Sequence, residues 1–253
     1  MASVVDAFNE ALSEDLSFLK FAIYSIPVYF CVKFFLVGQM GMFYFYGAIT
    51  AILLWGLLTQ GINNVRMNRN EILTLNPLKL LNSIIRTFLA VVPTLVVWVT
   101  VGTLIVKNVK IPIELPHVPL IFQIIVWSII FSIVMTSYMS FSKYLKVQQA
   151  FNYKVIGESC IDVLISFLFF VPQLIIANGI LVGPVAYLFF FFHLPFNHWG
   201  FVLYCSMVFV INISILANFL AQASYEHIKG NNEEYDDYSQ INLIDESAER
   251  MKG

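Results

Sequence analysis

The sequence predicts an all-α fold: a polytopic transmembrane helix bundle with six spans. Hydrophobic residues make up 59% of the 253 residues and charged residues only 12%, which is too apolar for a water-soluble domain of this length. Six apolar segments also reach the roughly 20 residues that are needed to cross a hydrocarbon core of about 30 Å. The predicted spans are residues 18–37, 42–60, 84–106, 119–139, 161–180 and 199–221.

The basic residues predict the orientation of these spans. Of the 14 Lys and Arg residues, 11 lie near the chain ends or near the connections after spans two and four, and only Lys33, Lys107 and Lys110 lie on the other side. The positive-inside rule therefore places both termini in the cytoplasm and the connections after spans one, three and five outside. Three regions follow: an N-terminal helix (1–17), the transmembrane domain (18–223) and a tail (224–253).

The N-terminal region predicts an amphipathic interfacial helix. Val5, Phe8, Leu12 and Leu16 recur at helical spacing, with acidic residues on the other faces. An acidic face does not favour anionic lipid, so we expect this helix to contact protein. The first residues are acidic and the first apolar run has the length of a span, so we expect no cleaved signal peptide.

Residues 161–193 are too long for one span and contain several helix breakers. These breakers are Pro172, Asn178, Gly179, Gly183 and Pro184. The pattern favours a helix that ends near Gly179 and a short interfacial or re-entrant helix after it, because 13 apolar residues are too few to span. A seventh crossing, which would move the tail outside, is the alternative. Backbone without regular structure at membrane depth must be buried or line water, so this break is a candidate site for a cavity, with a kinked helix end packed on its neighbours as the alternative.

The C-terminal tail changes composition abruptly, with eight acidic residues in the last 30. Such a segment buries too little apolar surface to order alone. Ile241, Ile244, Ala248 and Met251 would share one face of a helix, which is typical of a docking segment. Two interpretations stay open: a docking helix for a cytoplasmic protein partner, or a solvated acidic tail.

The order of elements resembles a known family. A short acidic helix leads into FLKFAIYSIPVYF, and span two ends in TQGINNVR with Gln60 and Gly61. The segments NPLKLLNSIIRTF, FSKYLKVQQAFNYKVI and FLAQASYEH then follow in order. Over residues 5–228 this is similar to six-span bacterial and archaeal membrane proteins of unknown function that are related to the membrane domain of glycerophosphodiester phosphodiesterases. The resemblance implies an auxiliary or transport-like membrane module, and it supplies no catalytic residues.

Ionisable residues within the spans are the first candidates for function, because charge inside a bilayer is unfavourable. Arg86 and Asp162 fall at similar depths near the cytoplasmic ends of spans three and five. We expect them to form a structural ion pair, with a proton or substrate relay as the alternative. The Gln and Asn residues of the spans favour hydrogen bonds between helices.

The predicted external side carries candidate metal ligands. Glu114, His117, His193 and His198 fall there, and imidazole and carboxylate groups suit zinc. None of them has the i, i+4 helical spacing of a preformed site, so histidines at a membrane boundary are the simpler interpretation. We expect no cofactor. The three cysteines indicate free thiols rather than disulfides, and they are Cys31, Cys160 and Cys205.

Arg66 and Arg69 are candidates for contact with a lipid phosphate at the inner face, although basic residues are common there. No metalloprotease, phosphate-loop or nucleophile-elbow motif occurs, so the sequence predicts no enzyme. It favours an accessory or scaffold subunit of an inner-membrane complex, with membrane lipids and a cytoplasmic protein as partners and no nucleic acid. The alternative is a small transporter or channel for a metal, lipid or other small solute.

Overall fold

In the computed structural model the chain is mainly helical over its described residues, which are 8, 12–13, 16–67, 72–109 and 118–228. Six of the helices in this part are long and apolar enough to cross a membrane, and no strand occurs in it. The all-α prediction with six membrane-length helices is therefore confirmed. The elements are α2 (Ser17–Leu36), α3 (Met40–Arg66), α4 (Pro77–Asn108), α5 (Val118–Tyr144), the 3₁₀ helix η1 (Val147–Phe151), α6 (Tyr153–Phe191) and α7 (Trp199–His227).

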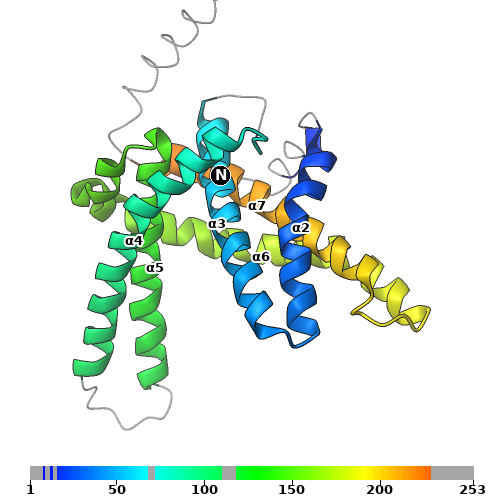
Figure 1. Ribbon diagram of the computed structural model, residues 1–253. Coiled ribbons are helices and arrows are strands. Elements are labelled where there is room, and N and C mark those ends of the chain that lie inside the picture. The colour runs from blue at the N-terminus through cyan, green and yellow to red at the C-terminus, as the bar shows by residue number, and fades with distance from the viewer. Residues whose placement is uncertain (1–7, 9–11, 14–15, 68–71, 110–117, 229–253) are drawn as a thin grey trace, which may run out of the picture.

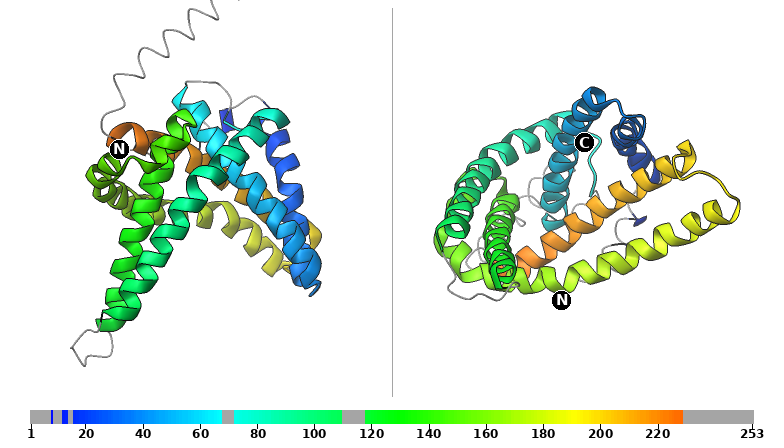
Figure 2. Two further views of the ribbon diagram at one scale, coloured as in Figure 1. Left: turned by 60° about the vertical axis from the view of Figure 1, so that its left-hand side comes forward. Right: turned by 90° about the horizontal axis from the view of Figure 1, so that it is seen from below.

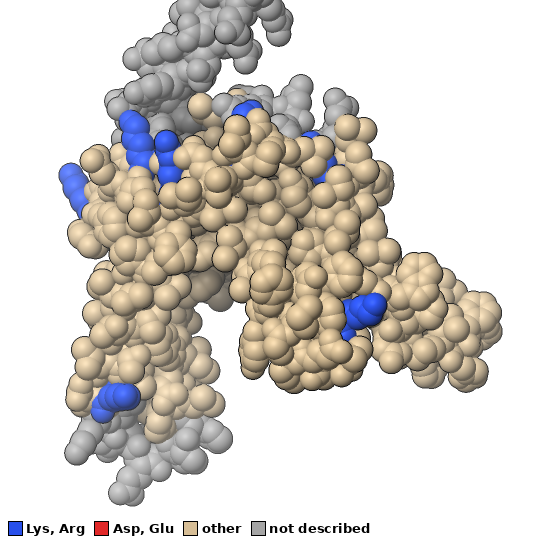
Figure 3. Space-filling model, in the orientation of Figure 1, with Lys and Arg blue, Asp and Glu red and all other residues tan. Residues whose placement is uncertain are grey.

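The helices form three antiparallel hairpins: α2 with α3, α4 with α5, and α6 with α7 (Figure 1). The hairpins meet at one end and diverge toward the other. We call the first the basic end, because α2 begins and α7 ends there and because most of the Lys and Arg residues visible in Figure 3 gather there. The opposite end is the hairpin end, where α2 turns into α3 and α6 turns toward α7.

Packing is concentrated at the basic end. The buried residues of α2 lie between Ser17 and Val28, and those of α6 lie between Ile156 and Phe170. No residue of α6 beyond Phe170 is buried. α3, α5 and α7 each contact four of the other long helices, whereas α6 packs on α5 and α7 alone among the described elements. The half of the bundle near the basic end is thus a packed core. Toward the hairpin end the α4/α5 hairpin stands apart, whereas the end of α2 and the start of α7 still lie together and line one small pocket.

Two glycines of α3 allow this close packing. An added Cβ at Gly61 would lie 2.9 Å from the Cβ of Ala217 in α7, and one at Gly56 would lie 2.3 Å from Cγ1 of Ile84 in α4. Small residues let transmembrane helices approach closely, because lipid supplies no hydrophobic drive for helix association and packing must do so instead. Gly61 and Gly56 therefore set the distances from α3 to α7 and to α4.

Several helices extend beyond the predicted spans. α4 begins at Pro77 rather than residue 84, because the Oδ1 of Asn76 accepts hydrogen bonds from the backbone N–H groups of Leu78 and Lys79. Proline at the first helical position fits this start, since its missing N–H would have no partner there. α3 likewise continues to Arg66. Hydropathy locates only the apolar part of each helix.

The predicted break in span five is wrong. α6 is one helix of 39 residues that runs through Pro172, Asn178, Gly179, Gly183 and Pro184. Both glycines keep helical backbone without a positive φ, and proline is tolerated in transmembrane helices because the backbone groups that it frees are satisfied locally. Neither a re-entrant helix nor a seventh crossing forms in this helix. Seen from below, α6 and α7 run across the picture and so lean strongly relative to the other hairpins (Figure 2).

Most of the predicted N-terminal helix and all but the first residues of the tail lie outside the described residues. Of the N-terminal segment, Phe8, Leu12 and Ser13 are helical. Phe8 and Leu12 pack partly buried against the two hydrophobic clusters of the core. This contact fits the expectation that the segment packs on protein. Its amphipathic character and the side of the membrane on which it lies remain predictions.

Candidate functional site

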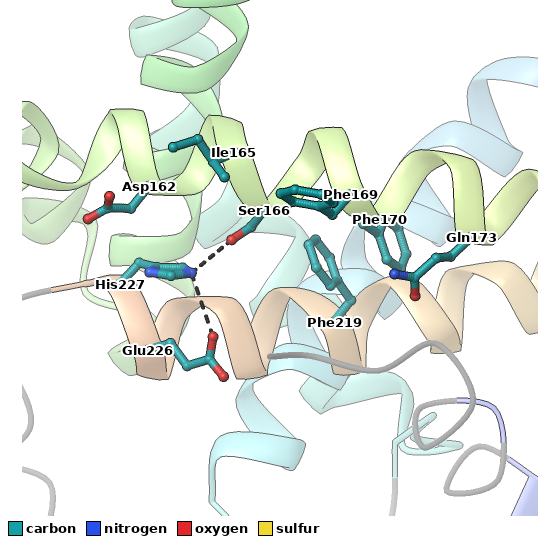
Figure 4. Close-up of a pocket in the computed structure, with 9 residues that line it drawn as sticks. All are labelled: Asp162, Ile165, Ser166, Phe169, Phe170, Gln173, Phe219, Glu226 and His227. Atoms are coloured by element: carbon teal, nitrogen blue, oxygen red, sulfur yellow. Dashed lines mark hydrogen bonds and ion pairs between the residues drawn. The ribbon is translucent and has the colours of Figure 1, made fainter.

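A pocket opens between α6 and α7 near the basic end (Figure 4). Its volume is about 160 Å³, which is room for more than a single water molecule. One wall comes from α6 and the other from the end of α7. The residues that line this α6–α7 pocket are Asp162, Ile165, Ser166, Phe169, Phe170, Gln173, Phe219, Glu226 and His227.

The α6 wall is a single helical face, because its residues recur at intervals of three and four. The face changes character along the helix. Asp162 and Ser166 come first, nearest the basic end, and the rings of Phe169 and Phe170 follow. From α7, Glu226 and His227 lie at the polar part and Phe219 lies among the rings. The pocket is therefore polar toward the basic end and aromatic further into the bundle.

The polar part contains a contact between Ser166 and His227. The Ser166 Oγ lies 2.8 Å from Nε2 of His227, and the same Nε2 lies 3.6 Å from a carboxylate oxygen of Glu226. A Ser–His–acid catalytic triad requires its acid on the other ring nitrogen. Among the described residues, no hydrogen bond or ion pair reaches Nδ1 of His227, so the arrangement is not a triad. It is a rim of hydrogen-bonding groups.

The charge of the pocket is one-sided. Asp162 and Glu226 contribute carboxylates, Ser166 and Gln173 contribute further oxygen acceptors, and neither Lys nor Arg is among the described residues that line the pocket. Anionic walls of low dielectric concentrate an attractive field for cations. The geometry thus suits a cationic group, with the apolar rings beyond it.

A second polar cluster lies inside the packed half and joins α3, α4 and α5. We call it the polar core, and it consists of Thr59, Gln60, Asn64, Ser83, Thr87 and Tyr138. Nε2 of Gln60 donates to Oδ1 of Asn64 at 3.0 Å, and Ser83 donates to Oε1 of Gln60. Thr87 donates to Thr59 at 2.8 Å, and the hydroxyls of Thr59 and Tyr138 are 2.8 Å apart.

Every member of the polar core is at most 4% exposed. Polar groups in an apolar interior are stable only when they are hydrogen-bonded, and the partners here come from neighbouring helices. Satisfied networks of this kind fix how the helices fit together. We therefore assign the polar core a structural role, in which it holds the three central helices in register.

Arg66 lies at the end of α3 and is only 6% exposed, and Asn63 and Asn64 beside it are buried as well. Contact with a lipid head group needs an accessible guanidinium, so this burial does not favour the expected lipid contact, which stays a prediction. Arg69 lies outside the described residues.

The structure does not bring Arg86 and Asp162 together. Arg86 donates from Nη1 to the carbonyl oxygen of Leu145 at 3.3 Å, while Asp162 lines the α6–α7 pocket. Both side chains are described, and no ion pair joins them. α4 and α6 share no direct packing, because α5 lies between them. The similar predicted depths of Arg86 and Asp162 in the membrane therefore did not mean that the two side chains are close in space.

The residues of the expected break have other surroundings. The side chain of Asn178 bonds to that of Asn212 in α7. A Cβ added at Gly179 or Gly183 would meet nothing within 4 Å, so both face outward. Pro172 lines a groove between α5 and α6. None of the four pockets described here, all lined by described residues, contains a residue from Gly179 to Pro184.

That groove is the largest of these hollows, with a volume of about 680 Å³. It lies where the α4/α5 and α6/α7 hairpins diverge. We call it the α5–α6 groove, and its lining residues are Leu120, Gln123, Ile124, Trp127, Ser128, Phe131, Leu164, Phe167, Leu168, Val171 and Pro172. Its surface is apolar apart from Gln123 and Ser128.

The candidate metal ligands divide between described and undescribed parts. Glu114 and His117 lie outside the described residues. His198 caps α7, because its Nδ1 accepts a hydrogen bond from the backbone N–H of Gly200 at 3.2 Å. His193 adopts a left-handed backbone conformation after α6, with φ of 53°. Within the described residues, no group of three His, Cys, Asp or Glu side chains is placed to hold a metal ion. All three cysteines are free, as expected.

Sequence reasoning missed Ser166 and His227, and with them the α6–α7 pocket. Asp162 and Ser166 are four apart, which places them on one face of a helix, so half of the pocket was visible in the sequence. His227 follows them by 61 residues, and no local pattern links it to them. The polar core could not be predicted from the sequence, because most of its hydroxyl groups belong to Ser and Thr residues, which occur throughout apolar helices.

Comparisons with known protein families, with curated proteins and with solved structures found no match for this chain.

Proposed function

We propose that the chain is a non-enzymatic integral membrane protein of the inner membrane that acts as an accessory or scaffold subunit of a membrane complex. One observation carries this proposal: the hairpins diverge from a packed end and leave the α5–α6 groove of about 680 Å³ between two of them. A packed, register-locked half provides a rigid platform. The open half provides a place for another membrane protein.

The occupant that fits the groove best is a transmembrane helix of a partner subunit. Gln123 is exposed to the membrane, and within the described residues no hydrogen bond reaches its side chain. Ser128 adds a hydroxyl to the same apolar wall. Lipid chains offer no partner to an amide or a hydroxyl, whereas polar residues of a neighbouring helix do. The groove surface therefore favours a helix over acyl chains.

The rest of the proposed role follows the sequence. The positive-inside rule puts the basic end in the cytoplasm, where the acidic tail would meet a soluble partner protein while lipids surround the hairpins. The resemblance to membrane modules related to glycerophosphodiester phosphodiesterases agrees with an auxiliary role, and it too remains a proposal.

Site-specific photocrosslinking in intact membranes tests this function. A photoreactive amino acid would replace Ile124 or Leu168 in the α5–α6 groove, and in separate control variants it would replace Val97, an exposed residue of α4 outside the groove. We expect one discrete protein adduct from the groove positions and only lipid adducts from Val97. Lipid adducts alone at all three positions would contradict the proposal.

A small transporter or channel is the second candidate. Its strongest sequence support was the break near Gly179, and α6 is continuous there. The buried polar core still offers it a polar path through the packed half. A transport path must admit water, so a cysteine in place of Ser83 would react with a small water-soluble thiol reagent. Protection of that cysteine, together with liposomes that show no flux of metal ions or small solutes, would count against transport.

A further inference from the structure

We propose that the α6–α7 pocket binds a primary ammonium group that is attached to an apolar chain. This inference does not depend on the accessory role, because it concerns a different surface from the α5–α6 groove. The order of side chains along the pocket carries it. Asp162 and Ser166 form the polar part, and Phe169 and Phe170 continue the same helical face further into the bundle.

The polar part matches a primary ammonium in charge and in hydrogen bonding. An ammonium group has three donors and no acceptor. At the polar part it meets the carboxylates of Asp162 and Glu226 and the hydroxyl of Ser166, with the imidazole of His227 beside them. Because neither Lys nor Arg is among the described residues that line the pocket, an anionic head group finds no permanent cation there. A metal ion is a poorer fit, since the described His, Asp and Glu side chains form no ligand group.

The apolar part matches a hydrocarbon chain. The ring of Phe170 stacks on that of Phe219 with centroids 3.8 Å apart, so α6 and α7 together form an aromatic wall. Phe169 is 60% exposed and stands beside this wall. A cation is also attracted to the face of an aromatic ring. An amphiphile with its amine toward the basic end and its chain along the rings satisfies both parts of the pocket.

The position of the pocket supports this orientation. Glu226 and His227 are the last residues of α7, and the sequence predicts that the last span ends a few residues earlier, at 221, so the polar part lies near the expected boundary between membrane and water. An amphiphile already in the bilayer would reach it from the side with its head group at the correct level. A lipid with a primary amine head group and a soluble long-chain amine share this chemistry, and experiment can separate them.

The test uses the full chain in dodecylmaltoside with dodecylammonium as the probe, and dodecyl sulfate as a probe of the same chain length and opposite charge. We expect dodecylammonium to bind and Asp162→Asn to weaken it by about tenfold or more, as for the loss of a charged hydrogen bond. Glu158→Gln is the matched control, because Glu158 is an exposed acid of α6 outside the pocket. Equal binding of the two probes, or equal affinity in wild type and Asp162→Asn, would overturn the proposal.

A second variant guards against an effect on folding. Phe169→Ala removes an exposed ring from the pocket wall and leaves every charge in place, so it should weaken dodecylammonium binding without loss of helical content. Unchanged binding in this variant would contradict the pocket as the site. Nanodiscs then identify the source of the ligand. Competition by phosphatidylethanolamine but not by phosphatidylcholine assigns the site to a lipid head group, and an absence of competition assigns it to a free amine.

Discussion

Asn178 of α6 and Asn212 of α7 exchange two hydrogen bonds within the least packed hairpin of the molecule. Nδ2 of Asn178 donates to Oδ1 of Asn212 at 3.1 Å, and Nδ2 of Asn212 donates to Oδ1 of Asn178 at 2.7 Å. The hydroxyl of Tyr204 donates to the carbonyl oxygen of Leu181 at 2.7 Å nearby. No residue of α6 beyond Phe170 is fully buried, although Leu174 and Ala177 pack partly buried against the core, so these polar bonds add to a thin apolar contact in setting the register of α6 against α7.

The asparagine pair should be energetically coupled. Asn178→Ala and Asn212→Ala should each destabilise the protein, because each leaves an amide without its partner in an apolar environment. A double-mutant cycle in detergent unfolding should give a coupling of about 0.6 kcal/mol, with about 1.7 kcal/mol as an upper bound for such pairs in membranes. Strictly additive effects would show that the two amides do not interact.

The tight approach of α3 to α7 predicts a difference between two glycines. Gly61→Ala should destabilise the bundle by about 1–3 kcal/mol, because its new Cβ would overlap that of Ala217. Gly179→Ala has open space beside it and removes a poor helix former, so it should leave stability unchanged or raise it by up to about 1 kcal/mol. Thermal unfolding in the same detergent compares the two. A Gly61→Ala protein as stable as Gly179→Ala would refute this packing.

The polar core predicts a similar contrast between two glutamines. Gln60→Leu removes the partner of Ser83 and Asn64 and should cost about 1–3 kcal/mol of stability. Gln123→Leu replaces an exposed amide of the groove with an apolar side chain and should not destabilise the isolated protein. Chemical unfolding monitored by circular dichroism measures both. Equal loss in the two variants would mean that the network does not hold the helices together.

The continuity of α6 can be measured as a distance. Spin labels at two exposed positions, Ile161 and Tyr187, are 26 residues apart. A continuous helix with a rise of about 1.5 Å per residue separates their backbones by about 39 Å. Pulsed electron spin resonance in nanodiscs should give a distance close to this value. A markedly shorter distance would indicate that the chain turns back near Gly179 after all.

The sidedness of the bundle is open to chemical labelling. Lys33→Cys and Asn197→Cys place thiols toward the hairpin end, whereas Lys146→Cys and Lys154→Cys place them at the basic end. A membrane-impermeant maleimide added to spheroplasts should label only the first pair. Labelling of the second pair instead would reverse the proposed orientation. The background needs alanine in place of the native thiols, which are Cys31, Cys160 and Cys205.

The number of helices and their approximate positions could be predicted from the sequence, because the length of an apolar segment is a local property. Six segments of span length became six helices, and the cysteines stayed free as their positions indicated. The same local reasoning failed at α6, where Gly179 and Pro184 are breakers in water. In an apolar environment a broken helix leaves backbone groups without hydrogen bonds, so the helix persists.

The sites could be predicted only in part, because they depend on which helices are neighbours. Arg86 and Asp162 have matching depth and opposite charge, yet α5 separates their helices. Ser166 and His227 meet only because α6 and α7 form a hairpin, and the sequence separation of 61 residues conceals this. Arg66 is a residue type that usually lies at the surface, but it is only 6% exposed at the end of α3. Topology, rather than composition, decided each outcome.

Because α6 is long, the thickness of the bilayer should affect how strongly this helix tilts. Its 39 residues measure about 58 Å, almost twice the hydrocarbon core of about 30 Å, so the helix meets the bilayer only by leaning. A thicker membrane would draw α6 more upright and bring it closer to α5. A thinner one would lay it flatter and widen the angle between them. Lipid composition would thereby set how far the groove between these two helices stands open.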